Sequence, residues 1–80
     1  MTVATAKEIG HRIRTTRKDR GLSQLQVAQL AGTHQSNLSG WETGSRDIFA
    51  WSMARLALAL HVSTDYLLGL TDDPDPAWKQ

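Results

Sequence analysis

Apolar residues recur every three to four positions along most of this chain, which is the period of an amphipathic helix. No stretch alternates apolar and polar residues as a half-buried strand does. Glycine often ends a helix in the left-handed conformation, and an apolar periodic segment precedes each of Gly21, Gly32, Gly44 and Gly69. The pattern therefore predicts an all-α fold, a compact bundle of five short helices.

Two of these helices are expected to begin with a capping box, in which a hydroxyl and a residue three positions later bond each other's backbone amides. Thr5 with Glu8, and Ser23 with Gln26, have this spacing. The other helix starts are expected at Thr33 or His34, at Asp47 as a possible cap for a helix over Ile48 to Leu60, and at Val62, Ser63 and Asp65 for a short helix to Leu68.

The fourth expected helix, residues 48–60, is apolar on nearly every side, unlike a solvated surface helix. Two stripes at helical spacing account for this composition. The inward stripe consists of Met53, Leu56, Ala57 and Leu60. The outward stripe consists of Trp51, Arg55 and Leu58. This outward stripe needs a contact of its own, and we expect it to form a dimer interface.

The stretch from Ser23 to Glu42 combines an apolar helix, a glycine turn and a polar helix. In its second half, amides and hydroxyls outnumber the large apolar residues, which are only Leu38 and Trp41. Such a helix needs a polar partner. An α-helix fits the major groove of DNA, where hydrogen-bonding side chains meet base edges. The stretch is therefore typical of a helix-turn-helix DNA reader.

The net charge of +1 does not by itself indicate a polyanionic partner, but the charges are segregated. Residues 1–46 hold seven Lys and Arg against three acidic residues, whereas residues 47–80 hold two against five. A basic front half suits a phosphate-binding face. The alternative is a solvated basic helix without such a role.

The composition argues against catalysis, so we expect no enzyme and no catalytic residue. The chain has no cysteine, which excludes disulfides, thiolate zinc sites and thiol nucleophiles. Its three histidines lack partners at metal-binding spacing, and Asp72, Asp73 and Asp75 lack the rest of a calcium loop. We therefore expect no metal, no cofactor and no small-molecule substrate.

No apolar run approaches the roughly 18 residues that a membrane span needs, and Met1 to Gly10 lacks the apolar core of a signal peptide. We expect a soluble cytoplasmic protein, associated with the nucleoid. Residues 71–80 contain three aspartates and two prolines, so they are expected to form a flexible tail. Residues 1–70 are then the DNA-binding domain.

Four segments, in order and suitably separated, resemble the helix-turn-helix family of the lambdoid phage repressors and Cro, the xenobiotic-response-element type. They are R-x-x-R-x-x-x-G-L-S-Q over 14–24, V-A-Q-L-A-G over 27–32, H-Q-S-N-L-S-G-W-E-T-G over 34–44 and L-A-L-A-L-H-V-S-T-D-Y-L-L-G over 56–69. The resemblance covers roughly Ile9 to Gly69. It implies a lambda repressor-like bundle that binds operator DNA, usually as a homodimer.

The resemblance also implies roles for matching residues. Gln35 and Ser36 would reach base edges at the exposed start of the third helix, because glutamine can donate to and accept from adenine in one plane. Gln24 would bond a backbone phosphate together with the amides of its helix N-terminus. His34 and Asn37 are further candidates for base contacts, and Thr33, Ser39 and Arg46 for phosphate contacts.

Arg17 and Glu42 match a pair that in the family forms a largely buried salt bridge; a phosphate contact by Arg17 is the alternative. The chain departs from the family at three positions. Gly40 stands where a long polar reader is common, so one base contact is missing or the backbone comes closer to the groove. Thr16 replaces a usual leucine, and Ile48 replaces a common proline.

Together these features predict a sequence-specific regulator of transcription that binds double-stranded DNA. It would act as a repressor on a palindromic operator, as a homodimer, with residues 34–42 in the major groove. The alternative is a protein-interaction module or an antitoxin of the same fold. The surface that such a partner would cover comprises Leu25, Leu30, Trp51, Leu58 and Trp78.

Overall fold

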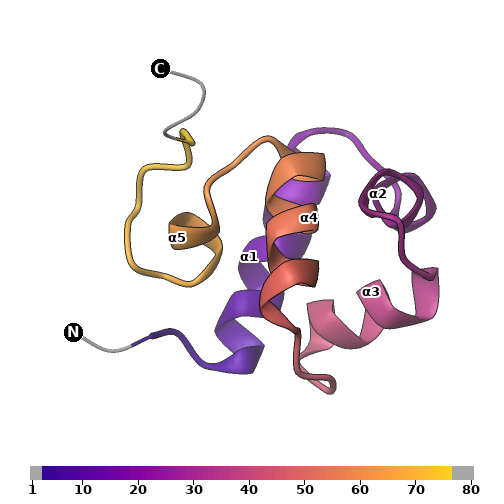
Figure 1. The fold of residues 1–80 in the computed structure, drawn as a ribbon, viewed down its shortest axis with the longest axis horizontal. Helices are drawn as coiled ribbons and strands as arrows, with labels where there is room; N and C mark the ends of the chain where they lie inside the picture. The colour runs from indigo at the N-terminus through magenta and orange to yellow at the C-terminus, as the bar shows by residue number, and fades with distance from the viewer. Residues whose placement is uncertain (1–2, 77–80) are drawn as a thin grey trace.

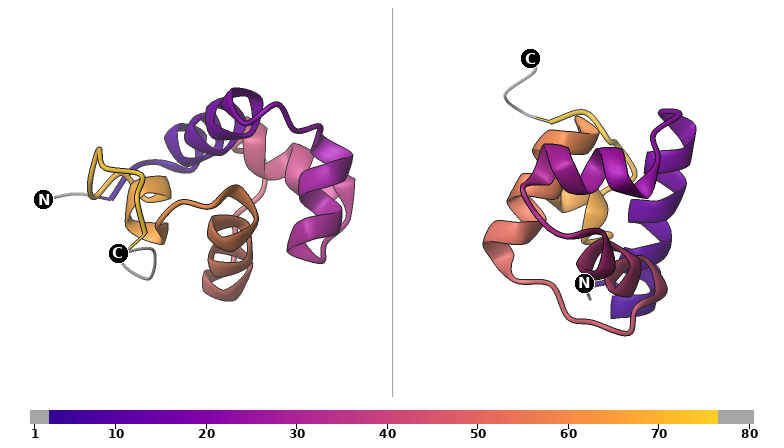
Figure 2. Two further views of the ribbon diagram at one scale, coloured as in Figure 1. Left: turned by 90° about the horizontal axis from the view of Figure 1, so that it is seen from above. Right: turned by 90° about the vertical axis from the view of Figure 1, so that its right-hand side faces the viewer.

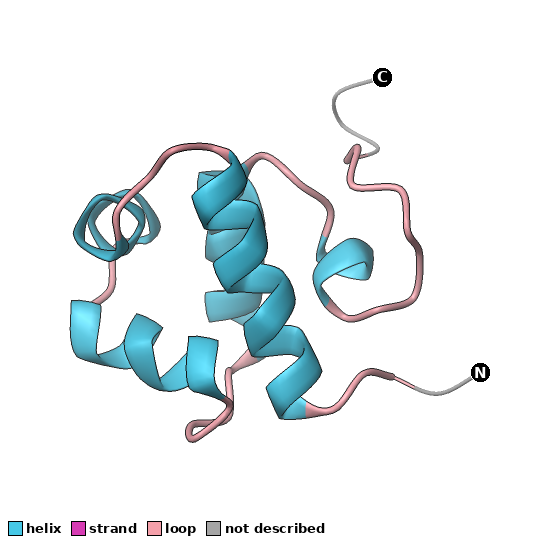
Figure 3. Ribbon diagram, turned by 180° about the vertical axis from the view of Figure 1, so that it is seen from behind, coloured by secondary structure: helices cyan, strands magenta, loops and turns pink. Residues whose placement is uncertain are grey.

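The computed structural model describes residues 3–76, and over this range it contains five helices and no strand (Figures 1 and 3). The helices are α1 (Ala6–Asp19), α2 (Gln24–Ala31), α3 (Gln35–Thr43), α4 (Ala50–Leu60) and α5 (Thr64–Leu67). In Figure 1, α1 and α4 cross the middle of the molecule, with α2 and α3 on one side and α5 on the other. The predicted all-α fold of five helices is confirmed.

The core is built from the apolar stripes of all five helices. α1 packs mainly on α3, and α2 packs mainly on α4. The inward stripe of α4 is buried as predicted, and fully buried side chains from the other helices meet it. The core side chains with no exposed surface are Ile13, Val27, Leu38, Leu56, Leu60, Val62 and Leu67. Each such side chain contributes about 1.5 to 3 kcal/mol through its burial.

Both predicted capping boxes are present. The amide of Glu8 donates to the Thr5 hydroxyl at 3.2 Å, and the amide of Thr5 donates to the Glu8 carboxylate at 3.0 Å. These bonds to the charged form, the backbone bond first, lower the pKa of Glu8. Ser23 and Gln26 make the same exchange at 3.1 and 2.8 Å, so the start of α2 is fixed independently of the core.

The start of α4 differs from the expectation. The helix begins at Ala50, its N-cap is Phe49, and no side chain bonds the free amides there, so the prediction that Asp47 caps this helix is wrong. Ile48 packs against the core from the extended connection that precedes the helix. The apolar run is therefore longer than the helix, because Ile48 at its start packs on the core from the loop before the helix.

A glycine in α1 brings this helix against the end of α3. A Cβ atom on Gly10 would collide with the carbonyl oxygens of Trp41 and Glu42. At the end of α3, Gly44 has φ +77° and would place a Cβ 2.8 Å from the Cα of Lys7. The two helices therefore meet backbone to backbone, which sets how α3 is held.

Residues 71–76 are not the free tail that the sequence led us to expect from residue 71. The amide of Ser63 donates to the carbonyl of Pro74 at 2.9 Å. Pro76 is fully buried. Pro74 and Pro76 therefore attach this segment to the domain, although residues 72–75 are exposed, and Trp78 lies outside the described part of the chain.

Arg12 holds this segment from α1. Its NH1 donates to the carbonyls of Tyr66 and Thr71 at 2.9 and 3.1 Å, and its NH2 forms a salt bridge with Asp72 at 3.1 Å. The guanidinium also lies 4.8 Å from the centre of the Tyr66 ring. One arginine thus connects the first helix with the chain that follows the last. Figure 2 shows both ends of the described chain at the end of the molecule away from α2 and α3.

Candidate nucleic-acid interface

α3 has a buried side and an exposed side. Leu38 has no exposed surface, Trp41 is buried, and Gln35 and Ser36 are exposed. His34, the N-cap of α3, is also exposed and makes no side-chain cap bond. The first turn of α3 therefore presents its polar side chains to solvent while its apolar residues anchor it.

The turn before α3 is a left-handed glycine cap. Gly32 ends α2 with φ +68° and ψ +37°, and the next amide, that of Thr33, donates to the carbonyl of Ala28 at 2.9 Å. A residue with a Cβ is strained in this conformation. The turn thus fixes the angle between the two helices.

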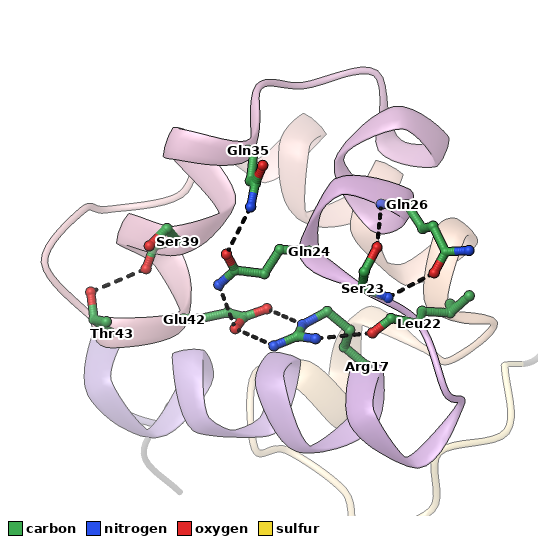
Figure 4. A network of polar contacts seen from close by, with 9 residues as sticks. All are labelled: Arg17, Leu22, Ser23, Gln24, Gln26, Gln35, Ser39, Glu42 and Thr43. Carbon is green, nitrogen blue, oxygen red and sulfur yellow. Dashed lines mark hydrogen bonds and ion pairs between the residues drawn. The ribbon is translucent and has the colours of Figure 1, made fainter.

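A buried salt bridge joins α1 to the last turn of α3 (Figure 4). Arg17 donates from Nε and NH2 to the two carboxylate oxygens of Glu42 at 2.7 and 3.0 Å, and from NH1 to the carbonyl of Leu22 at 2.9 Å. The side chains are 10% and 2% exposed. Arg17 is therefore bound within the protein on all three nitrogens, which leaves no place for the alternative phosphate contact.

Gln24 connects this salt bridge to the exposed face. Its Nε2 donates to Glu42 at 3.1 Å, and its Oε1 accepts from Nε2 of Gln35 at 3.4 Å (Figure 4). Because a carboxylate accepts only, it orients the Gln24 amide with its oxygen toward Gln35. The side chain that resemblance assigns to base reading is thus linked through one glutamine to the buried ion pair.

Asn37 and Arg46 form a second polar group on the other flank of α3. Arg46 NH1 donates to Asn37 Oδ1 at 2.7 Å, and Asn37 Nδ2 donates to the hydroxyl of Thr33 at 3.2 Å. Ser39 is half-buried, and its carbonyl accepts from the hydroxyl of Thr43 at 3.2 Å. Three residues from the sets expected to contact bases and phosphates are therefore bonded to one another.

The arginines of α1 contribute less to a basic face than the sequence count indicates. Arg12 and Arg17 are bonded to groups of the protein itself. Arg20, at the end of α1, donates from Nε to the carbonyl of Leu60 and from NH2 to that of His61 at 3.4 Å. Part of the charge in residues 1–46 therefore holds the fold together, which a count of charges does not reveal.

The outward stripe of α4 is exposed. Trp51 and Leu58 are 63% and 62% exposed, and the Arg55 guanidinium lies 5.0 Å from the centre of the Trp51 ring. Phe49, the N-cap of α4, is 72% exposed, which we did not predict. On α2, Leu25 and Leu30 are also largely exposed, away from this stripe in the sequence. α2 and the outward stripe of α4 thus each expose large apolar side chains.

Within residues 3–76, no three His, Asp or Glu side chains are grouped as a metal site would require. None of the helices there is both long and apolar enough to cross a membrane. An apolar groove runs between α1, α4 and the loop before α4, with walls that include Ile9, Ile13 and Met53. Of the described residues that line it, Arg46 and Asp47 are the ionisable ones.

An apolar helix, a left-handed glycine turn and a polar helix with an exposed first turn define a helix-turn-helix domain. A sequence model of the helix-turn-helix domain family matches residues 8–70, so the chain belongs to that family. This family consists of DNA-binding regulators of transcription and is not a class of enzymes.

Two curated relatives are transcriptional regulators of Bacillus subtilis (strain 168). The chain is 42% identical over 65 residues to the uncharacterized HTH-type regulator YobD, covering 81% of this chain and 58% of YobD. It is 34% identical over 61 residues to the HTH-type regulator ImmR, covering 76% of this chain and 48% of ImmR. The chain therefore spans about half the length of these relatives.

Solved structures show the same fold. The restriction-modification controller protein C.AhdI from Aeromonas hydrophila has a TM-score of 0.76 and 34% identity, over 78% of this chain and 94% of that one. The P22 c2 repressor, solved with a synthetic operator, has a TM-score of 0.72 and 32% identity, over 75% and 91%. A chain of the SinR–SinI complex has a TM-score of 0.72 and 33% identity, over 75% of this chain and 59% of that one. The resemblance to the repressor and Cro family is confirmed.

Proposed function

We propose that this protein represses transcription by binding double-stranded operator DNA in a sequence-specific manner, with α3 in the major groove. The observation that carries the proposal is the exposed Gln35, in the first turn of α3, linked through Gln24 to a buried salt bridge. Similarity to regulators, and to a repressor solved with an operator, supports it.

In this arrangement Gln35 takes an adenine with its amide, which donates and accepts in one plane. Ser36 and His34, exposed beside it, reach neighbouring base edges or phosphates. The free amides at the start of α2, next to Gln24, face a backbone phosphate. Thr33 and Ser39 are further phosphate contacts in this proposal. Readout thus comes from α3 and register from the elements around it.

The proposed assembly is a homodimer on a palindromic operator, paired through Trp51, Arg55 and Leu58. Half-sites about 10 to 10.5 base pairs apart then meet two copies of α3 on one face of the duplex. The support is the exposed apolar stripe of α4, with its arginine stacked on the tryptophan. Sedimentation tests this: Leu58→Arg should give the monomer mass, and an unchanged dimer mass would remove the assignment.

Selection of duplexes from a random pool tests the function as a whole. A palindromic consensus should emerge, and affinity should fall steeply with salt because each phosphate contact releases counterions. Failure to retain any duplex at low ionic strength would contradict the proposal. We place the protein in the cytoplasm, on the nucleoid, where such DNA lies.

A second candidate function is binding of a partner protein, as an interaction module or antitoxin. It is favoured by Leu25 and Leu30, which are 52% and 63% exposed on α2 and lie outside the proposed α4 interface. Replacing both leucines with Ser separates the two functions. Loss of a partner with full retention of DNA binding would assign α2 to that partner.

A further inference from the structure

Arg46 occupies a space along α3 that exists because residue 40 is glycine. A Cβ atom built on Gly40 would lie 2.7 Å from both Cγ and Cδ of Arg46. The arginine follows α3 in the sequence, yet its guanidinium reaches back to Asn37, the third residue of the helix. The stem of Arg46 therefore covers Gly40, which is buried although it lies on the outer side of α3.

Asn37 has both ends of its amide engaged. Its Oδ1 accepts from Arg46 at 2.7 Å, and its Nδ2 donates to the Thr33 hydroxyl at 3.2 Å. Reading an adenine would need the same oxygen and nitrogen together. In this geometry Asn37 positions the guanidinium of Arg46. The guanidinium takes the place in which we expected Asn37 itself to contact a base.

We propose that Arg46 reads a guanine in the major groove and replaces the long polar reader that the chain lacks at residue 40. This inference rests on the DNA-binding function proposed above and deepens it. Arginine recognises guanine by donating two hydrogen bonds, to O6 and N7, in one plane. Among residues 3–76 the Arg46 guanidinium makes a single hydrogen bond, through NH1. The edge formed by its Nε and NH2 is therefore open to a base.

The placement along the helix favours a base over a phosphate. At about 100° per residue, Gly40 lies almost opposite the buried Leu38, and Asn37 is its neighbour at three residues' spacing on one flank. Recognition helices meet base edges with their N-terminal residues, whereas flanking loops contact the backbone. Arg46 belongs to such a loop, but its charged end is held in the first turn of α3.

A charge-conserving substitution separates the two kinds of contact. Lysine keeps the positive charge but loses the planar pair of donors, so Arg46→Lys preserves a phosphate contact and abolishes bidentate reading. The wild type, Arg46→Lys and Arg14→Lys would each select duplexes from a random pool. Arg14 is exposed on α1 and serves as the matched control.

The expected result is a guanine whose preference falls on the order of ten- to hundredfold in Arg46→Lys and is unchanged in the control. Replacing this guanine by 7-deazaguanine, which lacks the N7 acceptor, should weaken the wild type and leave Arg46→Lys unaffected. An unaltered guanine preference in Arg46→Lys would overturn the proposal. So would an Arg46→Ala variant that loses affinity equally for all sequences with a salt slope lower by about one.

Gly40→Ala tests the space itself without touching the arginine. Alanine favours the helix over glycine, and a normal thermal transition would show that the variant folds. Its methyl group should displace the stem of Arg46 and reduce the guanine preference as Arg46→Lys does. Retention of the full preference in Gly40→Ala would overturn the role given to Gly40.

These outcomes differ from a failure of the function on which the inference rests. If the wild type selects no sequence, both fail together. If it selects a consensus in which one position depends on Gln35 and none depends on Arg46, DNA recognition by α3 stands and only the role of Arg46 fails.

Discussion

The two flanks of α3 hold their outward polar side chains by different means. On the anchored flank, Gln35 is bonded to Gln24, which is bonded in turn to the buried salt bridge. On the open flank, Asn37 is bonded to the exposed Arg46. If these side chains read DNA as proposed, the link to a buried ion pair couples recognition to folding. The solvent-exposed pair would then affect recognition alone, since its loss leaves no charge stranded in the core.

The largest effect should follow from breaking the anchored flank at its base. Arg17→Ala leaves the Glu42 carboxylate buried without its partner, which typically costs ~3 to 5 kcal/mol in the free energy of unfolding. Urea or thermal denaturation measures this loss, with Arg14→Ala as the exposed control. If Arg17→Ala were as stable as the wild type, the salt bridge would have no structural role.

Next in size is the removal of the linked amides themselves. Gln35→Ala should relax sequence preference at one operator position by about 1 to 3 kcal/mol, because one bidentate base contact is lost. Gln24→Ala should weaken all sequences through the proposed phosphate contact and should also reduce the preference that depends on Gln35, because it removes the bond that holds this side chain. Competition binding with single-base operator variants distinguishes the two patterns. A sequence preference untouched by Gln35→Ala would exclude Gln35 as a reader.

Substitutions on the open flank should hardly change the free energy of unfolding. Arg46→Ala removes an exposed side chain and an exposed hydrogen bond to Asn37, so its unfolding free energy should change by no more than about 0.5 kcal/mol. Chemical denaturation of this variant beside Arg17→Ala contrasts the two flanks directly. A loss of several kcal/mol would show that both flanks are coupled to folding.

The smallest effect concerns another solvent-exposed polar contact, the capping box of α1. The folded pKa of Glu8 is lowered by the bonds from Thr5, so this stabilisation is present above the unfolded pKa and is lost as pH falls through the folded value. Glu8→Gln keeps the geometry of the box but cannot titrate. Its stability should therefore fall slightly less than that of the wild type between pH 6 and about pH 3 in parallel thermal melts.

Local signals in the sequence specified the helices well where a cap or a glycine marks an end. Thr5, Ser23 and Gly32 each act on neighbouring backbone, so their roles can be read without knowing the fold. The start of α4 could not be found in this way. Its apolar run begins at Ile48, and periodicity does not distinguish a core residue in a helix from one in an extended loop.

Long-range contacts were beyond the sequence unless a resemblance supplied them. The bridge between Arg17 and Glu42 was available from matching positions, whereas the bonds of Arg12 and Arg20 to distant carbonyls were not. The same holds for Gly10. That this position must lack a side chain becomes visible only when α3 is seen to lie across it. Of the proposed interface, the residues could be named but not their bonds to one another.

The contact of Gly10 with the end of α3 bears on how this reader could be redesigned. Because main chain meets main chain there, the tilt of α3 is set by atoms that no surface substitution alters. Gln35, Ser36 and Arg46 can then be exchanged as a set while the docking angle stays constant. New operator preferences could then be introduced on the same scaffold, provided that residue 10 remains glycine and carries no Cβ atom.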